Sequence, residues 1–62
     1  MKIYYVRGLG FHNGFLSIKD NKRVWGMEKQ LFSEQEISHI QIPQYIAYEI
    51  KTIDGITVYR NE

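Results

Sequence analysis

The stretch Phe32-Ser33-Glu34-Gln35-Glu36-Ile37 predicts the start of a helix in a chain of 62 residues that otherwise favours strands. Ser33 is a favourable N-cap residue, and Glu36, three positions later, can accept a hydrogen bond from the Ser33 backbone N–H. The apolar residues at the two ends of the stretch are placed to form a hydrophobic staple. Because Pro43 cannot lie comfortably inside a helix, we expect this helix to be short and to end near residues 39–40.

The residues before this helix predict three strands. Residues 2–7 are rich in β-branched and aromatic side chains, which strands favour. Residues 8–14 contain three glycines, which indicates a loop with unusual backbone angles. Residues 15–19 and 23–27 are then typical of a hairpin about the dipeptide Asp20-Asn21.

The register of this hairpin stays open in the sequence. A two-residue turn would place Leu16 beside Trp25. The same turn would place Ile18 beside Arg23, whereas a one-residue bulge would place Ile18 beside Val24.

The stretch Ile53-Asp54-Gly55-Ile56 predicts a second hairpin, because Asp-Gly between apolar strands favours a type I′ turn. That turn would pair Ile50 with Tyr59, and Thr52 with Thr57. The face expected toward the core carries Ile46, Tyr48, Ile50 and Tyr59. The opposite face, which we interpret as partly covered or as an interface, carries Glu49, Lys51, Ile53, Ile56, Val58 and Arg60.

Together these segments predict an α+β fold, a small and mainly antiparallel sheet of about five strands with one short helix, in the order β-β-β-α-β-β. The length allows a single domain over residues 1–62. A chain this short buries only about 60% of the surface that its unfolded form exposes. Cysteine is absent, so stability must come from the nine aromatic residues or from a partner chain, for example in a homodimer.

The apolar runs of the chain are short, far below the ~20 residues that span a bilayer. The first residues lack the apolar region of a signal peptide. With no cysteine either, these features favour a cytoplasmic protein with no membrane partner.

Charge is distributed unevenly along the chain, although the net charge is only +1. Residues 1–29 hold six basic and two acidic side chains, whereas residues 30–62 hold two basic and five acidic ones. If this division survives folding, the surface has one positive and one negative region.

Residue patterns argue against an enzyme and against a bound cofactor or metal. The glycines of residues 8–14 miss the G-x-G-x-x-G spacing and precede a strand rather than a helix, so they do not predict a phosphate site. His12 and His39 lie far apart in sequence with no cysteine between them, which disfavours a metal site. Ser33 serves as a cap, and no other nucleophile has a base beside it.

A binding module therefore remains, and the basic hairpin is its most informative segment. Cationic and aromatic side chains gather there, and exposed Tyr, Trp and Arg are typical of protein-binding hot spots. The same composition suits single-stranded nucleic acid, in which bases stack on rings beside a positive groove. A structural or assembly subunit is the third alternative. The partner-binding candidates are Tyr5, Phe11, His12, Lys19, Lys22, Arg23 and Trp25.

Part of the layout resembles small uncharacterised proteins of phages and prophages of Gram-positive bacteria. The resemblance rests on the opening segment Lys2–Val6, the hairpin after it, the segment Leu31–Ile37, and Ile42-Pro43 with Tyr45 before a closing strand. It covers about half of the chain, and the hairpin at residues 53–56 departs from it. The resemblance implies no enzymatic activity. It implies an accessory protein that binds and modulates or inhibits a host protein, for example one used in defence, in the host cytoplasm.

Overall fold

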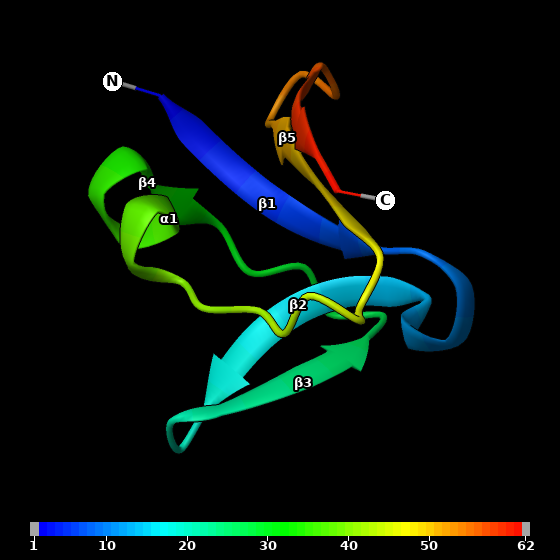
Figure 1. Cartoon of the computed structure of the whole chain (residues 1–62). Helices are drawn as coiled ribbons and strands as arrows, with labels where there is room; N and C mark the ends of the chain where they lie inside the picture. Colours follow the sequence, from blue (N-terminus) through cyan, green and yellow to red (C-terminus); the bar gives the residue numbers. More distant parts are fainter. Residues whose placement is uncertain (1, 62) are drawn as a thin grey trace.

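The computed structural model describes residues 2–61 and consists of one bent antiparallel sheet with a short helix beside it (Figure 1). The sheet has the order β3-β2-β1-β5-β6, and a further short strand, β4, pairs with β1. The elements are β1 (Ile3–Gly8), the 3₁₀ helix η1 (Gly10–His12), β2 (Gly14–Lys19), β3 (Lys22–Gly26), β4 (Phe32–Ser33), α1 (Glu34–His39), β5 (Tyr48–Thr52) and β6 (Thr57–Arg60). The predicted fold class is confirmed, and β4 was missed because it has only two residues.

Strand β1 organises the sheet because all but one of its residues pair with β5 along one edge, from Tyr4 to Gly8. Its other edge is shared between two partners. Near its end Arg7 pairs with Phe15 of β2, and at its start Ile3 pairs with Ser33 of β4. Since β2 pairs with β1 only near residues 7–8, the β2–β3 hairpin turns away from the rest of the sheet, as Figure 1 shows.

Helix α1 begins as predicted. The Ser33 hydroxyl accepts a hydrogen bond from the Glu36 backbone N–H (3.2 Å), and the Glu36 carboxylate accepts one from the Ser33 N–H (2.8 Å). Ile37 packs on the buried cluster that includes Phe32, as the staple requires. The helix ends at His39, and its contact with β4 and β1 covers that side of the sheet.

The β2–β3 hairpin adopts the register with a two-residue turn. Leu16 pairs with Trp25, and Ile18 pairs with Arg23. The turn residues Asp20 and Asn21 both have positive φ, at 51° and 63°. This conformation matches a type I′ turn, and Asp and Asn tolerate it better than most residues.

The β5–β6 hairpin departs from the prediction. Ile50 pairs with Tyr59 as expected, but a bulge follows and Lys51 pairs with Thr57, so the predicted pairing of Thr52 with Thr57 is wrong. The predicted type I′ turn is also wrong, because of the turn residues 53–56 only Gly55 has positive φ (88°). The Gly55 N–H donates to the Thr52 carbonyl (2.8 Å). This is the three-residue loop in which a left-handed glycine forms a bulge, a common alternative for Asp-Gly sequences.

The core is small and centred on β1 and β2. Val6 and Leu16 are fully buried, and the other buried apolar residues are Tyr4, Phe32 and Ile46. The residues predicted for the core face are buried to different extents. Ile46 is buried, Tyr48 and Ile50 are partly buried, and Tyr59 is half-exposed. Tyr59 stays accessible because β6 lies at the end of the sheet, where its ring packs beside that of Tyr48 (5.8 Å).

Candidate functional site

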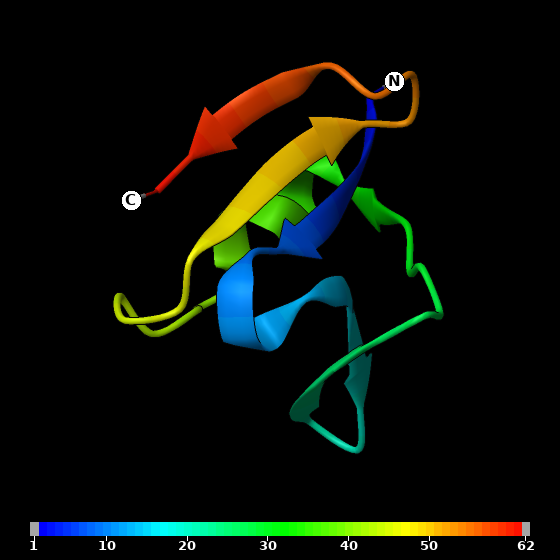
Figure 2. The same cartoon turned by 90° about the vertical axis from the view of Figure 1, so that its right-hand side faces the viewer.

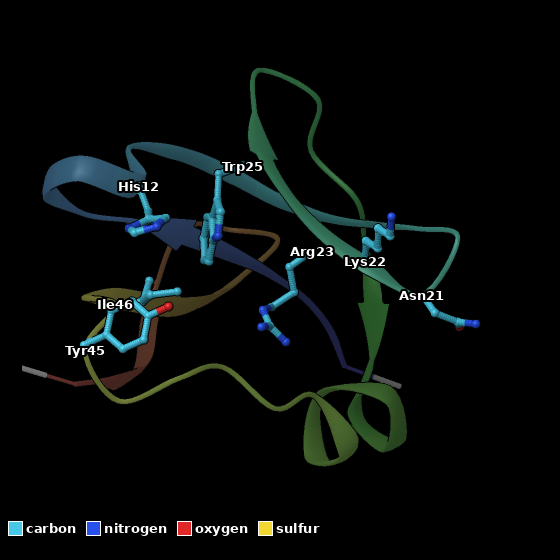
Figure 3. Close-up of a pocket in the computed structure, with 7 residues that line it drawn as sticks. All are labelled: His12, Asn21, Lys22, Arg23, Trp25, Tyr45 and Ile46. Carbon is cyan, nitrogen blue, oxygen red and sulfur yellow. The ribbon is translucent and has the colours of Figure 1, made fainter.

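An open cleft of about 420 Å³ lies between β3 and the turn that precedes β5 (Figure 3). Its lining comes from three segments that are distant in sequence: η1, the β2–β3 hairpin and residues 45–46. The lining residues are His12, Asn21, Lys22, Arg23, Trp25, Tyr45 and Ile46. Four of the seven predicted binding residues therefore meet here.

Trp25 occupies the centre of this cleft. It extends from β3, is partly buried, and meets the His12 ring edge-on with centroids 6.0 Å apart. Gly8 makes this packing feasible, because a Cβ at that position would overlap the His12 carbonyl and approach the Trp25 ring to 2.8 Å. The His12–Trp25 pair is thus held against the end of β1, and His12 is not simply an exposed loop residue.

Arg23 reaches across the cleft from β3. Its guanidinium Nη1 donates a hydrogen bond to the Gln41 carbonyl (3.1 Å), which lies in the segment between α1 and β5. Lys22 and Asn21 lie farther along the hairpin toward its turn, and Figure 3 shows both pointing away from the Trp25 ring. The cationic groups therefore extend from the ring pair toward the hairpin tip.

The turn before β5 completes the cleft with residues that the sequence did not place there. Ile46 is buried at 4% exposure, whereas the Tyr45 ring is 83% exposed. The turn closes through the Ile46 N–H, which donates to the Pro43 carbonyl (3.0 Å). The chain has more large aromatic residues than a small core can bury, so the sequence could have indicated that Tyr45 is exposed. No sequence pattern indicated that Ile46 and Asn21 line the cleft.

The electrostatic character of the cleft is positive. Among the described residues that line it, Lys22 and Arg23 are cationic and no carboxylate is present. The positive charge belongs to the β2–β3 end of the sheet, whereas the β5–β6 hairpin at the other end carries as many acidic as basic side chains. Figure 2 shows the two hairpins on opposite sides of β1.

Three predicted residues lie outside this cleft. Lys19 forms an ion pair with Glu28 (2.7 Å), and this hydrogen-bonded contact lowers the pKa of the Glu28 carboxyl below 4.5. Phe11 neighbours His12 in η1, but its side chain is fully exposed. Tyr5 contacts Phe15 edge-on (5.6 Å), and the Lys29 ammonium lies 4.4 Å from the centre of the Tyr5 ring.

The cleft offers binding chemistry in the form of aromatic faces, cations and hydrogen-bond donors. Within residues 2–61, no three His, Asp or Glu side chains gather closely enough to hold a metal ion. Nor does any helix in this part of the chain combine the length and hydrophobicity needed to cross a bilayer.

Comparison of the chain with models of protein families gives no match, and neither characterised proteins nor solved structures give one. The resemblance to phage accessory proteins therefore stays a prediction.

Proposed function

We propose that this protein is a non-enzymatic binding module that acts by occluding or recruiting another protein through the cleft around Trp25. The observation that supports this is the convergence of Trp25, Tyr45 and Arg23 on one open surface. These three residue types dominate the binding energy of protein interfaces. A phage-encoded modulator or inhibitor of a host defence protein in the cytoplasm fits such a module, as the sequence resemblance implies.

The charge of the cleft determines the kind of partner segment that suits it. Lys22 and Arg23 favour an acidic segment, and the exposed Tyr45 ring offers apolar contact beside them. Oppositely charged patches accelerate association and exclude partners of like charge. We therefore expect the partner to present a carboxylate-rich segment with at least one large apolar side chain.

A second candidate function is binding of single-stranded nucleic acid. It is favoured by the same alternation of cations and rings, since bases stack on aromatic side chains while Lys and Arg neutralise phosphates. The two candidates differ in their salt dependence, because each neutralised phosphate releases counterions and affinity then falls steeply with salt.

The test is a pull-down with the tagged protein from a lysate of a Gram-positive bacterium. It is run with and without nuclease, and the bound protein and nucleic acid are both identified. The variants are Tyr45→Ala and Arg23→Glu, with Phe11→Ala as a matched control, because Phe11 is exposed but outside the cleft. Loss of a hot-spot residue should weaken the captured complex about 30-fold or more. The control should retain the partner.

Three results would decide the matter. A protein captured after nuclease treatment, lost in both cleft variants and kept by Phe11→Ala, supports the proposal. Recovery of nucleic acid, with affinity for a single-stranded oligonucleotide that falls steeply with salt, supports the second candidate instead. Capture that is equal for all variants contradicts a role of the cleft in either function.

A further inference from the structure

The β5–β6 hairpin carries an aliphatic surface at the end of the sheet opposite the cleft. Ile53, Ile56 and Val58 are 56%, 64% and 52% exposed. They line a hollow of about 280 Å³ whose only charged lining residues among those described are Lys2 and Asp54. We call Ile53, Ile56 and Val58 the hairpin patch.

The total surface of the chain is large for its mass. The accessible surface is 4742 Å², whereas a folded monomer of 7.4 kDa is expected to expose about 4,200 Å². Aliphatic side chains on the β5–β6 hairpin contribute to the excess, since three of them are more than half exposed within one hairpin. A contiguous group of exposed apolar side chains is typical of an interaction site.

The charges at each end of the sheet determine which end can contact a second copy of the chain. In a two-fold contact the same patch lies on both sides, so a patch that carries charges of one sign meets charges of that same sign. The cleft end would bring Lys22 and Arg23 close to the same two cations of the other copy, which is unfavourable. The hairpin patch is aliphatic, and Lys2 and Asp54 beside it cancel in net charge, so self-contact there has no such cost.

The two edge strands, β3 and β6, also differ in how readily they can contact another chain. β3 begins with Lys22 and Arg23, and charged residues on an edge strand discourage pairing with another chain. β6 contains Thr57, Val58 and Tyr59 before its one charged residue, and every residue of the strand is exposed. Its bulge opposite Lys51 twists the strand, so side-chain packing rather than a long shared ladder is the contact available to it.

We propose that the hairpin patch is the contact surface of a homodimer in which the β5–β6 hairpins of two copies pack against each other about a two-fold axis. The dimer leaves both Trp25 clefts accessible, because they lie at the other end of each sheet. Because only three aliphatic side chains form the patch, we expect a contact below the about 800 Å² per partner of a standard interface and micromolar rather than nanomolar self-association.

The test is sedimentation equilibrium of the purified chain from low micromolar to submillimolar concentration, together with the variant Ile56→Lys. A lysine in the patch would add a positive charge to both sides of the contact, and the buried like charges should weaken the dimer about tenfold or more. Ile53→Lys is a second variant, at an exposed side chain in the turn. Phe11→Lys is the matched control, because it makes the same apolar-to-charged change at an exposed position outside the patch.

Circular dichroism confirms that each variant is folded before its mass is compared. A wild-type dimer that Ile56→Lys and Ile53→Lys dissociate, and that Phe11→Lys leaves intact, supports the proposal. A chain that is monomeric at every concentration overturns it. A dimer that both patch variants leave unchanged, or that only Phe11→Lys dissociates, overturns it as well.

Discussion

The two antiparallel hairpins at the ends of this sheet differ in their turns and in the surfaces that they present. The β2–β3 hairpin is anchored by the fully buried Leu16 and presents Lys22, Arg23 and the Trp25 ring. The β5–β6 hairpin has no fully buried residue and presents aliphatic side chains. In a chain with so small a core, one end can thus be specialised for a charged partner while the other remains suited to apolar contact.

The largest loss of stability should come from Gly8→Ala, which disturbs the packing at the cleft end. The new Cβ would overlap the His12 carbonyl, so η1 and the Trp25 ring must move. Forcing atoms into a packed site costs about 1–3 kcal/mol, and a clash with backbone places this change at or above the upper value. Urea unfolding should report the loss of stability, and Trp25 fluorescence should report the displaced ring.

Gly26→Ala is the matched control for this change. Gly26 lies next to Trp25 in β3, yet nothing lies within 4 Å of a Cβ built there. We expect its free energy of unfolding to stay within about 0.5 kcal/mol of the wild type. Equal stability of the two alanine variants would show that the close contact at Gly8 does not hold the cleft.

Asn61→Ala should have the next largest effect, because Asn61 connects the two ends of the molecule. Its side-chain oxygen accepts from the Tyr48 N–H (2.7 Å), and its amide nitrogen donates to the Ile46 carbonyl (2.8 Å). Ile46 in turn lines the cleft. Leaving two partly buried backbone groups unsatisfied should lower the free energy of unfolding by about 1–3 kcal/mol.

Asn61→Asp separates the two hydrogen bonds, since it keeps the acceptor for Tyr48 and sets a carboxylate oxygen against the Ile46 carbonyl oxygen. Its stability should lie below that of the wild type, because two acceptors face each other where a donor met an acceptor. Hydrogen exchange should show faster opening at the Tyr48 amide in Asn61→Ala than in Asn61→Asp. Wild-type stability of Asn61→Ala would mean that water replaces the side chain without loss.

The smallest effect concerns the Lys19–Glu28 pair at the cleft end. The folded-state pKa of Glu28 lies below 4.5, its ordinary value, so folding favours the ionised carboxylate. This stabilisation is present in full above pH 4.5 and disappears as the pH falls through the lower, folded-state pKa. Because both side chains are exposed, the effect should be slight. NMR titration of the Glu28 carboxyl should show the lowered pKa, and Lys19→Gln should restore it; an unchanged pKa in that variant would refute the assignment.

The sequence correctly predicted the elements that are stabilised by contacts between residues close in the chain. The start of α1 depends on Ser33 and Glu36, which contact each other across three residues, and both hydrogen bonds form as expected. The class of fold followed in the same way from the strand patterns. The turn at Gly55 went wrong because Asp-Gly suits two loop types, and the Thr52 hydroxyl supports the longer one by accepting from the Ile56 N–H (3.2 Å).

Only the part of the cleft formed by residues close in sequence could be predicted. Lys22, Arg23 and Trp25 are close in sequence, so their grouping on one hairpin could be inferred from spacing alone. Tyr45 reaches the same cleft from a turn about twenty residues away, and no periodicity reports such a long-range approach. Tyr5 was assigned to the same surface, although alternation along β1 carries it to the Phe15 and Lys29 side of the sheet.

The divided edge of β1 also has a consequence for the folding rate of the chain. Both hairpins consist of neighbouring residues and can form early, but a two-stranded hairpin alone is only marginally stable. Their common partner is β1, whose residue Tyr5 pairs with Lys51 near the other end of the chain. The rate-limiting step should therefore be the closure of this long loop, and the transition state should contain β1 already docked on β5.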